Sequence, residues 1–264
     1  MSRIVPFESN YKTIRKFEKA SFCSIVISAT IVTGIWLISL IEFNQKYRDL
    51  INFIIEFLKV ISYVTMLGYI GFSLISKILF SIAEKEKRKD LIDNSFDTNY
   101  TVEKSNEYYN NNDIQIGIKR LAFNTNESSF HTENTLRLML FKMTIKYLIF
   151  LTPFLLSIFS INGQQVIRLL FEMSIPIEMT ISFILAFKYF IEIKKINENF
   201  QLELLAIGNR EIKDYEIPKL LIPVMEYYNV KSWASLNLDE KIFKRNNEKL
   251  SKLWIEQKSK YLNN

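Results

Sequence analysis

Residues 20–41 read ASFCSIVISATIVTGIWLISLI and contain no charged side chain. A helix rises about 1.5 Å per residue, so roughly 20 apolar residues cross the hydrocarbon core of a bilayer, which is about 30 Å thick. The stretch is long for the core of a signal peptide, and no clean small-x-small cleavage site precedes polar sequence. It predicts a membrane-spanning helix at about 21–41. The alternative is a buried helix of a soluble bundle.

A second apolar segment runs over about 53–83, and its uncharged part is VISYVTMLGYIGFSLIS at 60–76. Lys59 and Lys77 bracket this part. Long basic side chains at the ends of a span can extend to the membrane interface, so their positions agree with a second membrane helix.

Two more apolar segments lie at about 138–161 and 166–191, separated by the short polar sequence INGQQ. The last of the four is interrupted by Arg168, Glu172 and Glu178. A charged residue inside a span costs free energy, so such residues usually face other helices, a partner or water. Glu172 and Glu178 are therefore candidates for a pore lining or an interhelical contact, with solvation at the outer interface as the alternative.

With only 6 Gly and 5 Pro in 264 residues, the chain is poor in the residues that interrupt helices. We therefore expect an all-α membrane protein with two transmembrane hairpins. The N-terminal flank and first hairpin occupy 1–83, and a cytoplasmic insert follows at 84–137. The second hairpin occupies 138–191, and a helical cytoplasmic tail occupies 192–264.

Lys and Arg gather in the flank, the insert and the tail. The loop of the first predicted hairpin carries Lys46 and Arg48, and the loop of the second carries only Arg168. Short loops rich in these residues stay in the cytoplasm. Both termini are thus predicted to be cytoplasmic, in the inner membrane of a bacterium with an AT-rich genome, as the abundant Ile, Asn and Lys suggest. The net charge of +6 then faces anionic lipid, a stronger explanation than nucleic-acid binding. The basic residues that decide this are Arg3, Lys12, Arg15, Lys16, Lys19, Lys85, Lys87, Arg88, Lys89, Lys188, Lys194 and Lys195.

The insert contains an unusual polar and aromatic stretch, LIDNSFDTNYTVEKSNEYYNNND at 91–113. Asn and Asp make turns, which favours a compact loop on the neighbouring helices. Tyr is enriched at interfaces, which favours a subunit or partner contact. Aromatics beside amides and carboxylates can also stack and hydrogen-bond a base, which favours a ligand site. The candidate residues are Asp93, Asn94, Phe96, Asp97, Tyr100, Tyr108, Tyr109, Asn110 and Asn111.

Local patterns give further expectations. The second helix should continue past residue 83, and the isoleucines within 114–118 suit either a short helix or a strand. NESSFHTEN at 126–134 predicts a turn before the third span, with Ser129 or Thr132 as the N-cap. The same interpretation gives His131 a turn or capping role.

In the tail, Gly208 and Asn209 predict the end of the fourth helix, and Pro218 and Pro223 predict breaks after it. A closing amphipathic helix is expected from the spacing of seven, four and seven residues between large apolar side chains. We expect this helix to pack on the insert in preference to the membrane surface. Its apolar positions are Phe243, Leu250, Trp254 and Tyr261.

The sequence contains no phosphate-binding loop, dinucleotide fingerprint, HExxH or GxSxG motif. Its single histidine, His131, and single cysteine, Cys23, argue on composition against a zinc site or a Cys/His nucleophile. We expect neither an enzyme nor a protein with a metal or cofactor.

The layout of two hairpins, an insert and a tail, with Phe96-Asp97 in an acidic and aromatic patch after the second helix, resembles a known family. It is similar to the four-transmembrane effectors of bacterial SMODS-type nucleotidyltransferase anti-phage systems. The resemblance implies a homo-oligomer that assembles in the inner membrane on an infection signal, breaches it and halts the host cell. The implied signal is a cyclic oligonucleotide or a partner protein of the defence system. A housekeeping channel or transporter and a membrane-anchored assembly partner are the alternatives.

Overall fold

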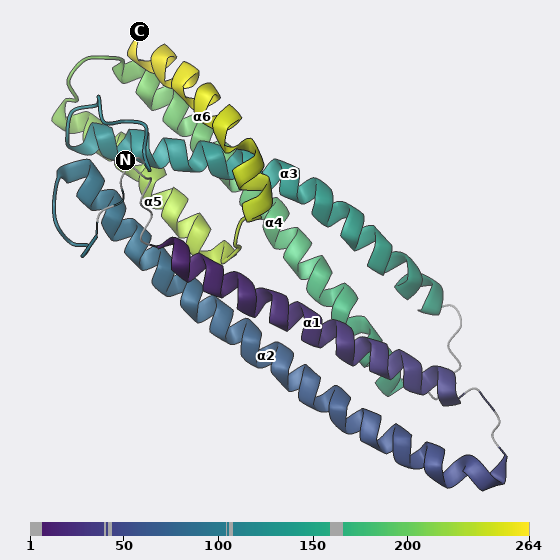
Figure 1. Ribbon diagram of the computed structural model, residues 1–264. Helices are drawn as coiled ribbons and strands as arrows, with labels where there is room; N and C mark the ends of the chain where they lie inside the picture. The colour runs from purple at the N-terminus through teal and green to yellow at the C-terminus, as the bar shows by residue number, and fades with distance from the viewer. Residues whose placement is uncertain are drawn as a thin grey trace. The chain divides into compact units, whose positions relative to one another are not determined.

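The computed structural model describes residues 7–39, 41, 44–103, 105, 108–158 and 166–263, and the side chains of these except 36 and 149–179. The chain is 85% helical, and the described residues contain no strand (Figure 1). The prediction of an all-α protein is therefore confirmed. The elements are α1 (Glu8–Ser39), α2 (Gln45–Phe96), α3 (Ile118–Ile158), α4 (Val166–Ile207), the 3-10 helix η1 (Asp214–Glu216), α5 (Ile217–Ala234) and α6 (Glu240–Leu262).

The chain divides into two compact units that share the four long helices. Unit 1 contains the start of α1, the C-terminal part of α2, the N-terminal part of α3, the C-terminal part of α4, and α5 and α6. Unit 2 contains the remaining parts of α1 to α4. The boundaries are Met1–Tyr11, Phe80–Met143 and Ile184–Asn264 for unit 1, and Lys12–Leu79 and Thr144–Phe183 for unit 2.

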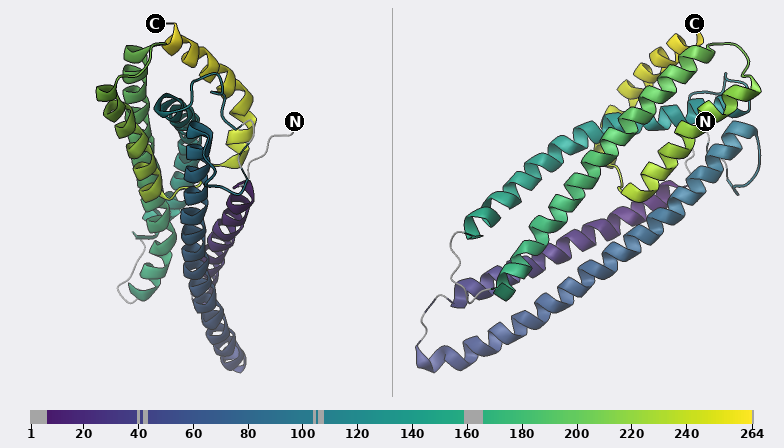
Figure 2. Two further views of the ribbon diagram at one scale, coloured as in Figure 1. Left: turned by 90° about the vertical axis from the view of Figure 1, so that its left-hand side faces the viewer. Right: turned by 180° about the vertical axis from the view of Figure 1, so that it is seen from behind.

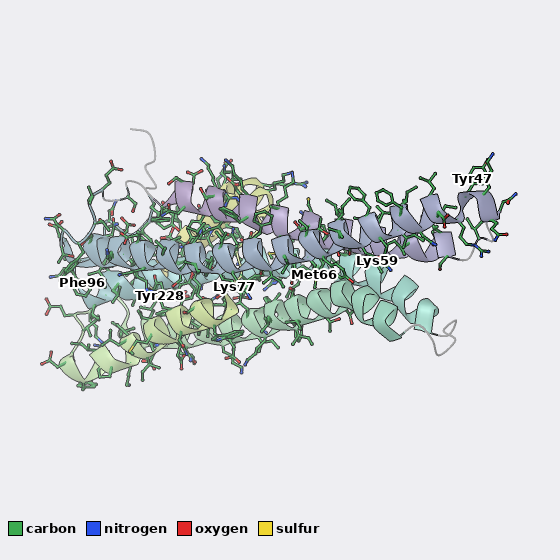
Figure 3. The ribbon with its side chains drawn as sticks, turned by 90° about the horizontal axis from the view of Figure 1, so that it is seen from below. Tyr47, Lys59, Met66, Lys77, Phe96 and Tyr228 are labelled. Atoms are coloured by element: carbon green, nitrogen blue, oxygen red, sulfur yellow. The ribbon has the colours of Figure 1, made fainter. Side chains whose placement is uncertain are left out.

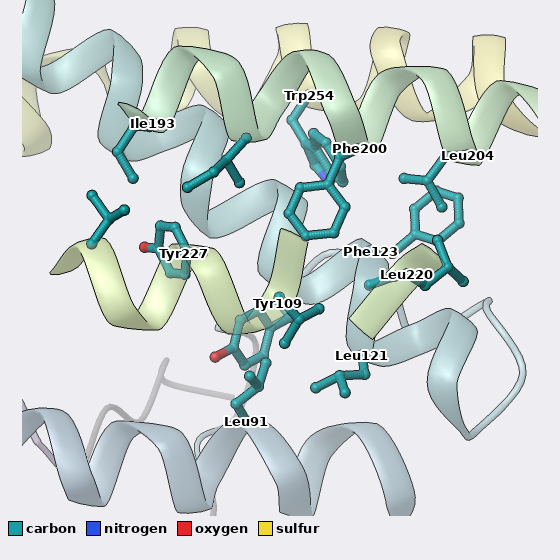
Figure 4. Packing of buried hydrophobic residues seen from close by; sticks show 14 of the residues in the cluster. Leu91, Tyr109, Leu121, Phe123, Ile193, Phe200, Leu204, Leu220, Tyr227 and Trp254 are labelled. Atoms are coloured by element: carbon teal, nitrogen blue, oxygen red, sulfur yellow. The ribbon is translucent and has the colours of Figure 1, made fainter. Parts of the chain in front are cut away.

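Unit 1 has an apolar core to which α2, α3, α4, α5 and α6 all contribute (Figure 4). Trp254 of α6, Phe200 of α4 and Tyr227 of α5 are fully buried in it. The ring of Trp254 meets Phe123 of α3 edge-on, with 6.5 Å between centroids. Each buried aromatic side chain removes roughly 150–250 Å² from water, so these rings dominate the stability of the unit.

The polar run at 126–134 lies inside α3, so the predicted turn and the capping roles of Ser129 and Thr132 are wrong. Thr132 donates to the Ser128 carbonyl at 2.7 Å and contacts the hydroxyl of Tyr227 at 3.2 Å. Ser129 donates to Asn197 of α4. These bonds satisfy the polar side chains without interrupting the helix. His131 is likewise helical, with its ring 5.9 Å from that of Phe243.

The tail follows the sequence patterns in part. α4 ends at Ile207, and Gly208 adopts a φ of 59°, a left-handed conformation that glycine takes without steric cost. Pro218 lies in the first turn of α5, where a missing N–H costs nothing. Pro223 lies inside the same helix, so the break predicted there is wrong. The burial of Leu220 and Tyr227 beside it offsets the lost hydrogen bond.

In unit 2, α1 and α2 lie side by side as an antiparallel pair (Figure 2). The Ser28 hydroxyl lies 2.9 Å from that of Ser62, and the Ser21 hydroxyl donates to the Tyr69 carbonyl at 3.2 Å. A Cβ on Gly68 would lie 3.5 Å from the Ser24 hydroxyl, so this glycine lies at a close helix contact. Small and hydroxyl side chains let two helices approach closely inside a membrane.

α3 and α4 also meet in unit 2. The rings of Tyr147 and Phe183 stack with 5.5 Å between centroids and an interplanar angle of 7°. Most of the third and fourth predicted spans, 138–161 and 166–191, lie where side chains are outside the described set.

Candidate functional site

The polar stretch at 91–113 begins on the last turns of α2, where two aspartates one turn apart hold the loop that follows. The Asp93 carboxylate accepts hydrogen bonds from the backbone N–H groups of Tyr100 (2.8 Å) and Thr101 (2.7 Å). It also accepts from the hydroxyls of Thr98 and Thr101, both at 2.7 Å. Burial opposes its ionisation, but these four bonds hold the pKa of Asp93 below its usual value.

The second aspartate, Asp90, holds the far end of the same loop. Its carboxylate accepts from the backbone N–H of Ser105 at 2.7 Å and from the Ser105 hydroxyl at 2.6 Å. Asn94 donates to the Asp90 carbonyl at 2.9 Å and to the Ser105 hydroxyl at 3.1 Å. The loop is therefore fixed from two points on α2.

Several side chains at the end of α2 and in the loop are exposed, although Ser95 is buried. Asp97 follows the helix with a φ of 54°, a left-handed conformation that Asp tolerates at a helix end. Phe96 is partly exposed, Tyr100 is 67% exposed and Val102 is fully exposed. The anchored loop therefore presents an aromatic and an aliphatic side chain to its surroundings.

A second polar cluster forms where the loop meets α3. Glu127 accepts from the backbone N–H of Asn110 at 3.0 Å, from its side-chain amide at 2.6 Å and from the Asn111 amide at 2.8 Å. Burial is the main cause that raises the pKa of Glu127, and the bonds from the two asparagines only partly offset it. Lys258 of α6 donates to the Asn110 carbonyl at 2.8 Å and pairs with Asp113.

α6 packs on this cluster, which confirms its expected place on the insert. The indole N–H of Trp254 donates to Asn111 at 3.4 Å, a long bond. Leu250, Trp254 and Tyr261 are buried, as the spacing predicts, whereas Phe243 is only partly buried.

The two adjacent tyrosines lie on the inner side of the stretch. Tyr109 is buried, and its ring meets Tyr108 edge-on with 4.7 Å between centroids. Tyr108 also meets Phe7, at the start of α1, at 5.3 Å. The ammonium of Lys87 lies 5.4 Å from the Tyr108 ring, a cation–π distance.

The structure therefore does not gather the nine candidate residues into one site. Asp93 and Asn94 hold the loop, Asn110 and Asn111 join Glu127, and Tyr108 and Tyr109 pack inward. Among the three interpretations, these contacts favour a compact loop folded on neighbouring helices, with Tyr100 left available to a partner.

The candidate pore residues Glu172 and Glu178 both lie in α4. Their side chains lie outside the described set, so their role stays a prediction.

A charged cluster that we did not predict lies in the core of unit 1. Lys231 of α5 pairs with Glu84 of α2 at 2.7 Å, with side chains only 8% and 3% exposed. Tyr11 of α1 donates to the same carboxylate oxygen. Burial would raise the pKa of Glu84, but Lys231 and Lys87 outweigh it and hold that pKa below its usual value.

A signal for half of this cluster exists in the sequence. The buried positions on α2 continue from Ser76 and Phe80 through Ala83 to Lys87 and Asp90, at spacings of three and four. Of the basic run, only Lys87 therefore falls on the face that packs against other helices, whereas Lys85 is exposed. Lys231 likewise falls on the buried face of α5, four residues after Tyr227, but no local pattern joins this face to that of α2.

The described part of unit 2 exposes many large apolar side chains. Its buried side chains, among those the structure describes, are four serines and two isoleucines: Ser21, Ser28, Ser62, Ser76, Ile14 and Ile25. Its exposed side chains include Phe53, Phe57, Val64, Leu67 and Ile78. Figure 3 shows side chains along α2 between Tyr47 and Phe96, with Lys59 and Lys77 on either side of Met66.

α1 and α2 are each long and apolar enough to cross a membrane, by length and composition. A soluble core helix passes the same test, but such a helix is mostly buried. Only 18% of the most apolar part of α1 and 6% of that of α2 is buried.

Metal-binding geometry is not found in the part of the chain that the structure describes, since no three His, Cys, Asp or Glu residues there are grouped to hold an ion. Comparison with protein families, with curated proteins and with solved structures returned no match.

Proposed function

We propose that this chain is a four-span protein of the bacterial inner membrane that assembles with further copies on an infection signal and breaches the membrane. Both termini and the insert at 84–137 face the cytoplasm. The observation that carries the membrane part is the burial pattern in the described part of unit 2, where four of the six buried side chains are serines and many large apolar side chains are exposed.

Water does not favour such a surface. A typical monomer exposes an apolar patch of at most a few hundred Å², and larger ones mark interaction sites or membranes. The exposed apolar residues of α2 recur from Phe53 to Ile78. At about 1.5 Å per residue this is about 38 Å of helix, long enough to cross a hydrocarbon core of about 30 Å. Lipid chains solvate this apolar surface without cost. The hydroxyls of Ser28 and Ser62 are paired with each other between α1 and α2, so neither is left without a partner in lipid.

The effector part of the proposal rests on the resemblance described above and on the division of the chain. Unit 1 offers a folded polar unit that could receive a signal, and unit 2 offers helices that could act on lipid. α2 passes from one to the other without interruption between Gln45 and Phe96.

Reporter fusions test the topology. Fusions after Asn44 and Gly163 should report the outside of the cell, and a fusion after Asn112 should report the cytoplasm. An external signal at Asn112 would overturn the orientation.

Induced expression with a membrane-potential dye tests the activity. Depolarisation followed by growth arrest supports an effector. The matched control is Leu67→Lys, which should be produced but not inserted. A full-length chain that inserts and is triggered by infection, yet leaves the potential unchanged, would favour an assembly partner or a housekeeping transporter.

A further inference from the structure

The buried cluster around Glu84 joins three segments that are far apart in the sequence. Tyr11 belongs to the second turn of α1, Glu84 and Lys87 to α2 just past its apolar stretch, and Lys231 to α5. Tyr11 and Lys231 both donate to Oε1 of Glu84. One carboxylate oxygen is therefore the meeting point of the three helices.

The same place is reinforced by aromatic rings. Tyr11 meets Phe80 of α2 at 6.3 Å between centroids, and the Lys231 ammonium lies 6.0 Å from the Tyr227 ring. Lys87 lies 5.9 Å from the ring of Phe7. The contacts hold the first turns of α1, before it continues into unit 2, against α2 and α5.

The charges do not balance within the cluster. Two buried lysines, Lys87 and Lys231, share one buried carboxylate. Taking ions out of water costs about as much as their mutual attraction returns, so a buried pair adds little net stability. Removing one partner, in contrast, leaves a charge without compensation in the core. Such a pair therefore favours one packing of the helices over alternatives that leave a buried charge unpaired. Separating both partners into water, in contrast, costs little free energy.

We propose that the Glu84–Lys231 ion pair, with Tyr11, is a latch that holds α5 against the first turns of α1 and the adjoining part of α2. When the latch opens, α5 and the first turns of α1 are released. The link from this opening to membrane breaching rests on the proposed function. α5 carries no predicted span of its own, so it can move without dragging a span through lipid.

The latch predicts an order of effects. Glu84→Gln leaves two buried lysines without their carboxylate and should open α5 most. Lys231→Met keeps the length of the side chain and leaves Glu84 beside Lys87, so it should open α5 less. The double variant Glu84→Gln/Lys231→Met removes both charges of the pair and should close α5 again, at least in part, because paired charges can often be replaced by uncharged groups without loss.

Amide hydrogen exchange of the full-length protein in lipid nanodiscs measures this opening. We expect exchange in α5 to rise roughly a hundredfold in Glu84→Gln, since removal of one buried partner leaves an uncompensated charge. The rise should be confined to α5 and the start of α1, and it should fall in the double variant. Glu248→Gln and Lys252→Met are the controls, because that pair is also about 3 Å long but 87% and 73% exposed.

Unchanged exchange in all three variants would overturn the latch. So would an equal rise across α3 and α6, or single effects that simply add in the double variant. The conservative Lys231→Met and the double variant keep the test informative where Glu84→Gln folds poorly.

The membrane-potential dye tests the link to activity separately. At matched expression, Glu84→Gln should depolarise cells without an infection signal, and the double variant should need the signal again. If Glu84→Gln depolarises cells only after the infection signal, and as fast as the wild type does, the link is overturned. If no chain depolarises them, including the triggered wild type, the proposed function fails, while the exchange data still decide the latch.

Discussion

Units 1 and 2 are both helical, yet they differ in where their large apolar side chains lie. Unit 1 encloses Trp254, Tyr227 and Phe200 and satisfies its buried carboxylates with hydrogen bonds. Among its described side chains, unit 2 buries four serines and two isoleucines and leaves many Leu, Ile, Val and Phe side chains exposed. The two units share helices: α2, for example, has residues in both.

From this difference we infer that lipid surrounds unit 2 and water surrounds unit 1. In water the hydrophobic effect drives apolar side chains inward, so the core of unit 1 has the pattern expected of a soluble bundle. In lipid that driving force between helices disappears, and close packing with interhelical hydrogen bonds replaces it. Substitutions at matched positions in the two units should therefore give opposite results.

The largest effect is expected in the core of unit 1. Trp254→Ala should lower the free energy of unfolding by about 3–5 kcal/mol, since the ring is fully buried against Phe123 and Phe130. Thermal unfolding followed by circular dichroism measures the loss. Ile255→Ala, one residue later and exposed, should change it by less than about 0.5 kcal/mol. Equal small losses would mean that unit 1 lacks a packed core.

The comparison is sharpest at exposed apolar positions. Leu67 of α2 is 68% exposed. In lipid, Leu67→Lys should oppose insertion by about 2.5–3.5 kcal/mol, seen as loss of protein from carbonate-washed membranes. Val102→Lys, at the fully exposed tip in unit 1, should have no effect. Retention of Leu67→Lys in the membrane at wild-type levels would count against lipid around α2.

The loop after α2 gives a smaller and pH-dependent effect. Asp93→Ala removes the acceptor of four hydrogen bonds, at an expected cost of about 1–3 kcal/mol to the order of residues 98–105. Limited proteolysis at this loop measures it, with Glu103→Ala as the exposed control. Because the pKa of Asp93 is lowered by folding, its contribution is present above the unfolded pKa of about 3.9 and is lost as the pH falls through the folded value. Equal cleavage of the wild type at pH 7 and below pH 3 would contradict this.

The smallest effect is expected inside unit 2. Ser28→Ala and Ser62→Ala should couple by about 0.6 kcal/mol in a double-mutant cycle, the typical value for such bonds in membrane helices. Unfolding in mixed micelles gives the coupling. Thr33→Ala serves as control, because Thr33 donates within its own helix, to Ala29. A coupling of zero would show that the hydroxyl pair does not stabilise the hairpin of α1 and α2.

Local patterns in the sequence predicted much of this fold. The extension of the second helix to Phe96, the end of α4 before Gly208 and the buried face of α6 all follow from residues within a few turns of one another. The run at 126–134 was misjudged as a turn, because its partners Asn197 and Tyr227 lie on other helices. These polar side chains resemble helix caps in the sequence, but in the folded chain they make hydrogen bonds to other helices in the core.

The candidate site shows the same division. The anchoring of the loop by Asp93 agrees with the expectation that Asn and Asp make turns there. The pairing of Glu84 with Lys231 was out of reach, since the two lie on helices that no local pattern joins. Whether Tyr100 meets a partner stays a prediction that the folded chain alone does not test.

Cysteine labelling tests most directly whether lipid surrounds unit 2 and water surrounds unit 1. In a Cys23→Ala background, single cysteines replace Leu67 and Val102, both exposed in the structure. Opened membrane vesicles, accessible from both sides, are treated with a water-soluble maleimide and then again in denaturant to count all thiols. We expect Val102→Cys to react fully before denaturation and Leu67→Cys to react only after it. Equal and rapid labelling of both before denaturation would contradict the account.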